Sequence, residues 1–337
     1  MIRHTLSIGP FEFEAGGRLE SVEIVYHTSP ERHDKVLWVC HALTANSDVE
    51  DWWPQLAGPG KLFDTDKYYV VCVNMLGSPY GSSGPRTANP VTGRPYFFDY
   101  PAITFRDMVK ASILVRKHLG INQIDLIIGS SVGGFQALEW AIMEPEVIRH
   151  AVLMATEPRV SPWFSAQVEA QRMAIEADPT FRACADLQGG AAGLKCARAQ
   201  GLISYRSYDG YARTQAESDP DTLFAGRAAS YERYQGEKLV RRDFDAYSYW
   251  YLCNAVDSHN VGRGRGGVPA ALQRIQARTT AIGIASDGLF PVAEVKAMAA
   301  LIPGAQYKEI DSDFGHDGFL LENGQLTAIL QPIIEKL

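Results

Sequence analysis

Short, continuous apolar runs recur along the chain, and segments with helical spacing separate them. The clearest runs are rich in β-branched residues and lie at 36–40, 69–73, 124–128, 151–154 and 280–284. Strands that are apolar throughout are typical of a parallel sheet covered by helices on both faces. One covering helix can be read in detail, because Thr104 and Asp107 can cap its start and Gly120 can end it. The pattern predicts an α/β fold with a mostly parallel central sheet.

The pattern changes at two places. Residues 6–26 alternate loosely between apolar and polar and contain Gly16 and Gly17, which favours an antiparallel hairpin at the edge of the sheet. Between 158 and 269 the β-branched runs vanish and helix-forming residues dominate, for example at 164–176. We therefore expect a core domain made of 1–157 and 270–337, interrupted by a helical lid at 158–269. The glycine- and arginine-rich run 262–267 follows no strand, so we expect a flexible return linker there.

Composition narrows the possible partners. The 337 residues are 46% hydrophobic and 21% charged, as in a soluble globular protein. With 32 basic and 39 acidic residues the net charge is −7, and no block of one sign resembles a surface for nucleic acid or an anionic membrane. The first residues contain no apolar signal-peptide core, and no run approaches the roughly 20 residues of a membrane span. The five cysteines include no CxxC pair. We expect a cytoplasmic protein with reduced thiols, no bound metal and a small-molecule or protein partner.

The segment 129–134, Gly-Ser-Ser-Val-Gly-Gly, carries the first candidate chemistry. It follows a predicted strand and precedes a predicted helix, which is the setting of a nucleophile elbow that exposes Ser131. A bare Gly-x-Ser-x-Gly match is weak, since it can also be a tight packing turn. This chain has one match, and that match has the required context.

A serine hydroxyl needs a base, and the base needs an orienting carboxylate; in this architecture they follow in the order serine, acid, histidine. Asp287 follows the run 280–284, and His316 lies 29 residues further on, so we predict them as acid and base. His41 and His259 are the other histidines in glycine-rich or strand-end contexts, with His259 ranked last because it lies in the lid. The backbone N–H groups of Val132 and of Leu43, which follows the run 36–40, are the predicted oxyanion hole.

Several segments together resemble the homoserine O-acetyltransferase family of α/β-hydrolase-fold enzymes. The match spans nearly the whole chain, and it fits least well around 186–211. The segments that carry it are His-Ala-Leu-Thr at 41–44, Gly-Pro-Gly-Lys at 58–61, Gly-Ser-Ser-Gly-Pro at 81–85, Asn-Pro at 89–90, the elbow with Gln-Ala-Leu-Glu-Trp at 136–140, Ser-Asp at 286–287 and Gly-His-Asp at 315–317.

The resemblance implies roles for particular residues. Ser131 would be the nucleophile, His316 the general base and Asp287 its orienting carboxylate. Arg172 would bind the carboxylate of the amino acid substrate, and Asp317 its ammonium. Leu289, two residues after the acid, would accompany acetyl donors, since arginine there accompanies succinyl donors.

The implied activity is transfer of an acetyl group from acetyl-CoA to the hydroxyl of L-homoserine, in methionine biosynthesis, by a ping-pong acyl-serine mechanism. Acetyl-CoA would be a co-substrate, no cofactor would be permanently bound, and a homodimer through the lid helices is expected. Serine O-acyltransferase, homoserine O-succinyltransferase and a plain esterase or thioesterase stay open as alternatives, because fold and triad are compatible with each. A catalytically silent binding module is a further alternative, which the intact set of triad residues disfavours.

Overall fold

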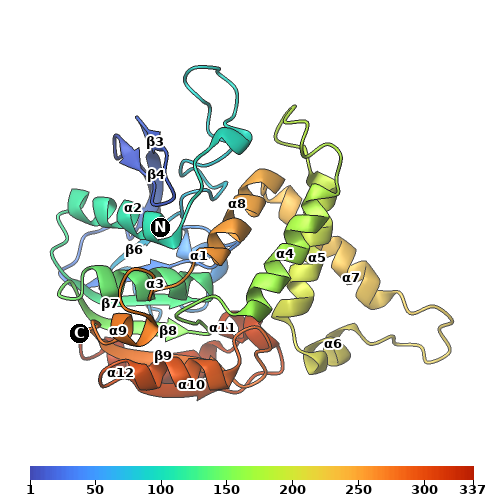
Figure 1. Cartoon of the computed structure of the whole chain (residues 1–337). Coiled ribbons are helices and arrows are strands. Elements are labelled where there is room, and N and C mark those ends of the chain that lie inside the picture. Colours follow the sequence, from blue (N-terminus) through green and yellow to red (C-terminus); the bar gives the residue numbers. More distant parts are fainter.

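A single eight-stranded sheet organises the protein, whose computed structural model describes residues 1–337. Six adjacent strands pair in parallel, and two further strands at one edge of the sheet pair antiparallel (Figure 1). In spatial order the strands are β1 (Ile2–Ser7), β4 (Glu23–Thr28), β6 (Tyr69–Val73), β5 (Val36–Cys40), β7 (Ile124–Ser130), β8 (Ile148–Met154), β9 (Arg278–Ile284) and β10 (Gln306–Ile310). The predicted α/β fold is confirmed, and each of the five apolar runs lies in a strand.

Two hydrophobic cores cover the two faces of the sheet. Alternate residues of β5 divide between them, with Trp38 in the larger core and Leu37 and Val39 in the smaller one. The larger core includes residues of α2 (Phe105–His118), α3 (Val132–Met143), α9 (Val268–Leu272) and α10 (Val292–Leu301). The smaller core includes residues of α1 (Val49–Trp52), α11 (Gly318–Leu321) and α12 (Asn323–Ile334). Burial on both faces explains why the central strands are apolar throughout.

The structure also confirms two local predictions, the start of one helix and the edge hairpin. Thr104 and Asp107 form the expected capping box at the start of α2. The predicted edge hairpin is present as the antiparallel pair β1 and β4, and between them a small ladder of β2 (Phe11–Glu12) and β3 (Arg18–Leu19) turns at Gly16 and Gly17, both with positive φ. β10 was not predicted. It is an edge strand with mostly exposed side chains, so it carries no continuous apolar run.

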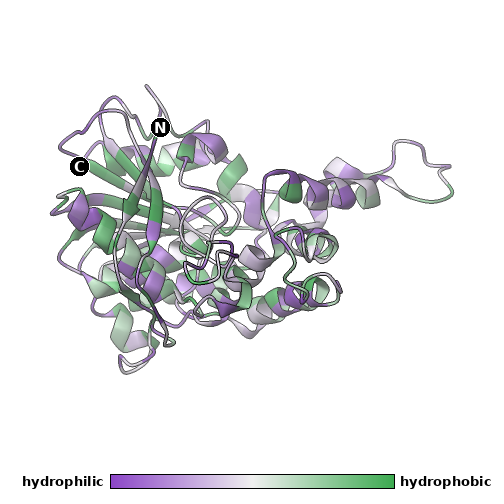
Figure 2. Cartoon of the chain, turned by 90° about the horizontal axis from the view of Figure 1, so that it is seen from above, coloured by the Kyte–Doolittle hydropathy of each residue, from purple (hydrophilic) through white to green (hydrophobic).

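Helices alone fill the chain between β8 and α9. They are α4 (Pro162–Glu176), α5 (Ala191–Tyr205), α6 (Tyr208–Gln215), α7 (Arg227–Arg241) and α8 (Ala246–Asp257). Figure 1 shows α4, α5 and α7 beside the core, and both views show the connection from α6 to α7 projecting away from it (Figures 1 and 2). Two 3₁₀ turns, Phe97–Asp99 and Gly315–Asp317, complete the elements, and no helix is long and apolar enough to span a membrane.

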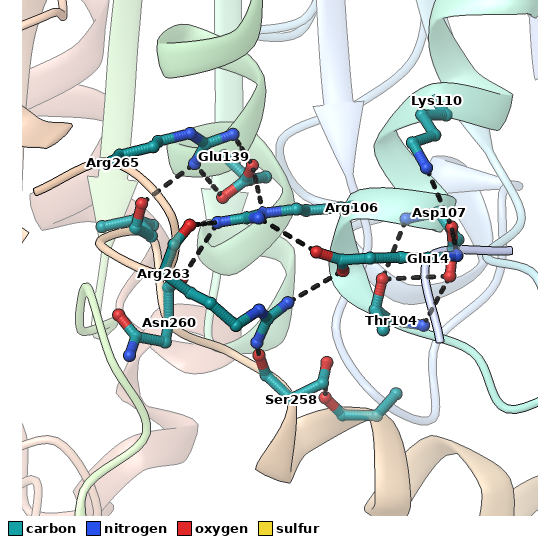
Figure 3. Close-up of polar contacts among 12 residues, drawn as sticks. Glu14, Thr104, Arg106, Asp107, Lys110, Glu139, Ser258, Asn260, Arg263 and Arg265 are labelled. Carbon is teal, nitrogen blue, oxygen red and sulfur yellow. Dashed lines mark hydrogen bonds and ion pairs between the residues drawn. The ribbon is translucent and has the colours of Figure 1, made fainter. Parts of the chain in front are cut away.

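The return segment 262–267 is tied down, in contrast to the flexible linker that we expected. Arg265 pairs with Glu139 of α3, at 2.9 Å between Nη1 and Oε2, and Arg106 of α2 reaches the same carboxylate at 3.1 Å. Arg106 and Arg263 both pair with Glu14 (Figure 3). The glycines allow the turn, whereas the arginines fix the end of the lid to the helix that follows the elbow.

We predict that this network contributes strongly to stability, because the Glu139 side chain is only 3% exposed. Glu139→Gln leaves two guanidinium groups without their shared counter-charge and should lower the free energy of unfolding by about 3 kcal/mol. Urea unfolding at neutral pH measures this. The control is Glu237→Gln, which breaks an exposed pair with Arg241 and should cost less than about 1 kcal/mol. Equal small losses would contradict the assignment.

Candidate active site

Ser131 lies in a sharp turn between β7 and α3. Its φ of 58° and ψ of −128° are strained for a residue with a side chain, as in a nucleophile elbow. The neighbouring glycines are required by space: a Cβ on Gly129 would lie 2.1 Å from the carbonyl oxygen of Gly133, and one on Gly133 would lie 2.2 Å from that of Cys40. The turn therefore presses the start of α3 against the end of β5.

Asp287 and His316 form a buried hydrogen-bonded pair. His316 Nδ1 lies 2.7 Å from Asp287 Oδ2, while Oδ1 accepts the backbone N–H groups of Leu289 at 2.8 Å and Phe290 at 2.9 Å. Asp287 follows β9 and His316 follows β10, so two parallel strand ends bring them together. Both carboxylate oxygens are occupied, and this fixes the orientation of the imidazole.

His316 Nε2 is buried and has no hydrogen-bond partner within the protein. His316 and Ser131 line the same cavity of about 280 Å³, where their exposed fractions are 3% and 6%. A free imidazole nitrogen that lines the same cavity as a serine is what a general base requires. The structure thus brings the three predicted triad residues to one site.

The predicted oxyanion donors lie on the two segments that the elbow presses together. Leu43 lines the cavity, and its N–H donates no hydrogen bond within the protein. Val132 is the first residue of α3, so its N–H has no acceptor in the helix. Both groups are free to bind an anionic oxygen next to Ser131.

The other two candidate histidines have structural roles. In His41, Nδ1 lies 2.9 Å from the carbonyl oxygen of Ala42, and Nε2 accepts the N–H of Met75 at 3.1 Å. Burial lowers the pKa of His41 to about 4, so the ring is neutral at pH 7 and its Nδ1–H holds the loop that carries Leu43. His259 is stacked on Phe135, and burial lowers its pKa to about 3. Neither ring is among the residues that line the cavity with Ser131.

Comparisons with known proteins agree with this geometry. A family model described as the α/β hydrolase fold matches residues 35–323. The homoserine O-acetyltransferase of Cyclobacterium marinum is 44% identical over 88% of this chain and 84% of its own length. The chain belongs to the homoserine O-acetyltransferase family. The resemblance found in the sequence is therefore confirmed.

Solved structures add information about the fold of this family. A homoserine O-acetyltransferase from Staphylococcus aureus, 28% identical, superimposes with a TM-score of 0.82 over 99% of this chain and 95% of its own. Esterase E22, 22% identical, reaches 0.87 over 99% of both chains. Because an esterase and an acetyltransferase share this fold, the substrate must be selected by side chains around the cavity.

Asp317, the predicted ammonium ligand, lines the cavity next to the family triad. Its Oδ2 forms a 2.8 Å ion pair with Nε of Arg206, which directly follows α5 and also lines the cavity. Burial raises the pKa of the Asp317 carboxyl, and Arg206 opposes that shift. A carboxylate and a guanidinium group thus face the cavity, where they could pair with the ammonium and carboxylate groups of a zwitterion.

Arg172 and Leu289 are placed elsewhere. Arg172, on α4, pairs with Glu169 and with Asp257, the latter at 2.6 Å, and it is not among the residues that line the cavity. Leu289 is 1% exposed, packs in the larger core and meets the site only through its N–H bond to Asp287. The structure does not bring either side chain to the cavity, so their predicted substrate contacts gain no support.

Four cations that were not predicted from the sequence line the cavity. They are Arg198 and Arg206 at α5, and Lys238 and Arg242 at α7. Arg198, Leu202 and Tyr205 are spaced i, i+4, i+7, and Lys238 and Arg242 are spaced i, i+4, so each set shares one helix face. This spacing is visible in the sequence, but it cannot tell a face toward a cavity from a face toward solvent.

Proposed function

We propose that this protein transfers an acetyl group from acetyl-CoA to the hydroxyl of L-homoserine through an acetyl-Ser131 intermediate. The observation that carries the proposal is the buried Ser131, His316 and Asp287 arrangement in a chain 44% identical to a protein named homoserine O-acetyltransferase. The acetyl assignment rests on the names of the relatives, because Leu289 does not line the cavity.

In the first half-reaction His316 Nε2 takes the proton of the Ser131 hydroxyl as Oγ attacks the thioester carbon. The N–H groups of Leu43 and Val132 stabilise the oxyanion, and the tetrahedral intermediate then collapses. The C–S bond breaks, and the sulfur of CoA leaves as the thiol with the proton from His316. Ser131 now carries the acetyl group as an ester.

In the second half-reaction the homoserine hydroxyl gives its proton to His316 and attacks the acetyl carbon. The same oxyanion hole acts again, Ser131 leaves and regains its proton, and O-acetylhomoserine is released. Attack by water would hydrolyse the acetyl-enzyme, and the burial of Ser131, which is only 6% exposed, favours transfer over hydrolysis. The chemistry needs no resident cofactor or metal.

The Asp317 and Arg206 pair supports an amino acid as the acceptor. The ammonium group can bind Asp317 while the carboxylate binds Arg206, so each protein charge exchanges one partner for another. Arg206 is better placed for the carboxylate than Arg172, since Arg206 lines the cavity and Arg172 does not. Exchanging ion-pair partners in this way costs less free energy than burying any of the two protein charges or the two substrate charges without a partner.

We also propose a cytoplasmic protein that acts in methionine biosynthesis, as the family resemblance implies. All five cysteines are free, and three of them are buried, which suits a reducing compartment.

The first prediction tests the acetyl-enzyme. Intact-protein mass spectrometry with acetyl-CoA alone should show one added acetyl group, and homoserine should remove it. Ser131→Ala should show no addition and at least about 10³-fold lower turnover, because triad members act as a unit. Acetylation that persists in folded Ser131→Ala would refute the mechanism. Rapid discharge without homoserine would favour the thioesterase alternative.

A second prediction concerns the acceptor. Asp317→Asn and Arg206→Gln should each raise the homoserine concentration needed for discharge about 10²-fold or more, the loss expected for one buried charged partner. Acetylation of Ser131 should change little, because the first half-reaction does not involve the amino acid. Arg172→Gln is the comparison. If it impairs discharge and Arg206→Gln does not, the carboxylate ligand is Arg172 as first predicted.

The remaining proposal is the homodimer through the lid. Leu223 and Phe224 are each 85% exposed on the connection from α6 to α7, which projects from the core (Figure 2). Exposed apolar side chains on a projecting segment favour burial against a second copy. We expect sedimentation equilibrium to give twice the chain mass, and Leu223→Ser with Phe224→Ser to shift it toward the monomer. A monomeric wild-type protein would rule the dimer out.

A further inference from the structure

A second cavity, of about 1070 Å³, lies at the edge of the sheet where the parallel strands begin. It is lined by the first part of β8 and β9, by β10, by the residues just before these strands and by one side of α12. Ser131, Asp287 and His316 follow the ends of their strands, so they lie at the opposite edge. The two cavities share no lining residue. The second cavity is therefore separate from the triad.

The sheet face that holds the smaller core changes from apolar to polar toward this cavity. On β9, Ile282 and Ile284 belong to the smaller core. Thr280 and Arg278 point to the same side of the sheet, because alternate residues of a strand do, and both line the cavity. On β10, Lys308 lies in register with Ile282 and lines the cavity as well. Side chains that would be costly to bury thus line an open space at the end of this core.

Three cations that line the second cavity have no partner in the protein. Arg278 of β9, Lys308 of β10 and Lys336, which follows α12, form no ion pair and no side-chain hydrogen bond. They come from three separate segments of the chain, so no block of positive charge marks them in the sequence. Together they give this end of the molecule an uncompensated positive potential, although the net charge of the protein is −7.

The other charged groups at the cavity do not neutralise these three. Arg149 of β8 also lines it and is paired with Asp125 at 3.0 Å. Glu146 and Leu337, which carries the terminal carboxylate, are the lining residues with negative charge, and neither forms an ion pair with a lining cation. Four cations thus face two anionic groups around the same space.

His150 of β8 responds to this positive charge. Its ring is half-buried, it lies in register with Arg278, and its Nε2 is 3.0 Å from Oγ1 of Thr280. Burial and the charge of Arg278 lower the pKa of His150 to about 4, so the ring is neutral at pH 7. An anion bound in the cavity would oppose the charge of Arg278 and therefore raise the pKa of His150.

We propose that this cavity, termed the strand-start site, binds a phosphate-bearing small molecule through Arg278, Lys308 and Lys336. Three cations from three elements suit a ligand with several negative charges, as a chain of phosphate groups has. An arginine binds phosphate through two parallel hydrogen bonds, and a lysine binds it as a point charge. The site is independent of the proposed acetyl transfer, because it contains no residue of the cavity that holds Ser131.

The wall of the strand-start site that α12 provides is apolar. Ile329 and Ile333 are spaced i, i+4 on α12, and Lys336 follows three residues later, so the three side chains share one side of the helix. An uncharged group such as a nucleoside can pack on the isoleucines while its phosphates reach the cations, and the cavity has room for a molecule of that size. A nucleotide and inorganic pyrophosphate share the required chemistry.

The experiment uses two histidines as reporters in the intact protein. NMR spectra of protein with ¹³C-labelled histidine rings are recorded with ATP, with inorganic pyrophosphate and with adenosine. His150, assigned with His150→Gln, reports on the strand-start site, and His316 reports on the cavity of Ser131. ATP and pyrophosphate should shift the His150 signal and move its titration midpoint to higher pH. Adenosine at the same concentration should do neither, because it carries no phosphate.

Variants with matched controls test the cations. Arg278→Gln and Lys308→Gln should each raise the Kd of ATP, measured at His150, about 10-fold, because each removes a hydrogen bond to a charged group. Arg274 and Lys117 are exposed cations without a partner that do not line the site. Arg274→Gln and Lys117→Gln should therefore leave the Kd within about 2-fold.

The results also decide between the two sources of phosphate. Tighter binding of ATP than of pyrophosphate supports a nucleotide that uses the α12 wall, and equal binding supports an inorganic ligand. A His150 signal that ATP leaves unchanged, or a shift confined to His316, would overturn the proposal. Adenosine that binds as tightly as ATP would show that phosphate is not recognised. Equal losses of affinity in Arg274→Gln and Lys117→Gln would reduce the effect to overall charge and would also overturn the site.

Discussion

The close approach of α3 to the end of β5 is the contact on which the rest of the site depends. A Cβ on Gly133 would collide with the carbonyl oxygen of Cys40, so only glycine permits this distance. Ser131, in its strained conformation, directly precedes this contact, and the segment with Leu43 directly follows the end of β5. One packing constraint therefore brings Ser131, the predicted nucleophile, close to the segments that carry the two predicted oxyanion donors.

Hydrogen bonds from the backbone complete this preorganisation. Asp287 uses one oxygen for two backbone N–H groups and the other for His316, which leaves Nε2 as the free nitrogen of the imidazole. His41 is neutral because burial disfavours its charged form, and in that form it bridges Ala42 and Met75. The site needs little reorganisation during the reaction, since the sheet and its loops already fix the reacting groups.

Some charged side chains of the lid form ion pairs within the protein, and others face the cavity. Arg172 is satisfied by Glu169 and Asp257 within the lid, and the ion pairs of 262–267 fasten the end of the lid to the core (Figure 3). Arg206 and Arg198, in contrast, face the cavity. Esterase E22 shares this fold over 99% of both chains, lid included, so the fold by itself does not select the substrate.

The sequence by itself determined the structural features that depend on residues close together in the chain. Continuous apolar runs specify buried parallel strands, Thr104 and Asp107 specify a helix start, and the glycines around Ser131 specify an elbow. The order of Ser131, Asp287 and His316 was also sufficient to select the residues that the structure brings together. β10 could not be predicted, because an edge strand with mostly exposed side chains needs no apolar run. The local sequence of 262–267 also does not indicate that its arginines pair with the distant residues Glu14 and Glu139.

Only the tertiary structure decided which charged side chains face the cavity. Arg172 and Arg198 are both arginines on lid helices, and nothing in their local sequence separates them. Arg172 pairs with Asp257, which lies 85 residues further along the chain. Arg198 instead lines the cavity, because α5 packs beside α7. A long side chain's partner is set by helix packing across the lid, and such long-range contacts leave no trace in the spacing of a single segment.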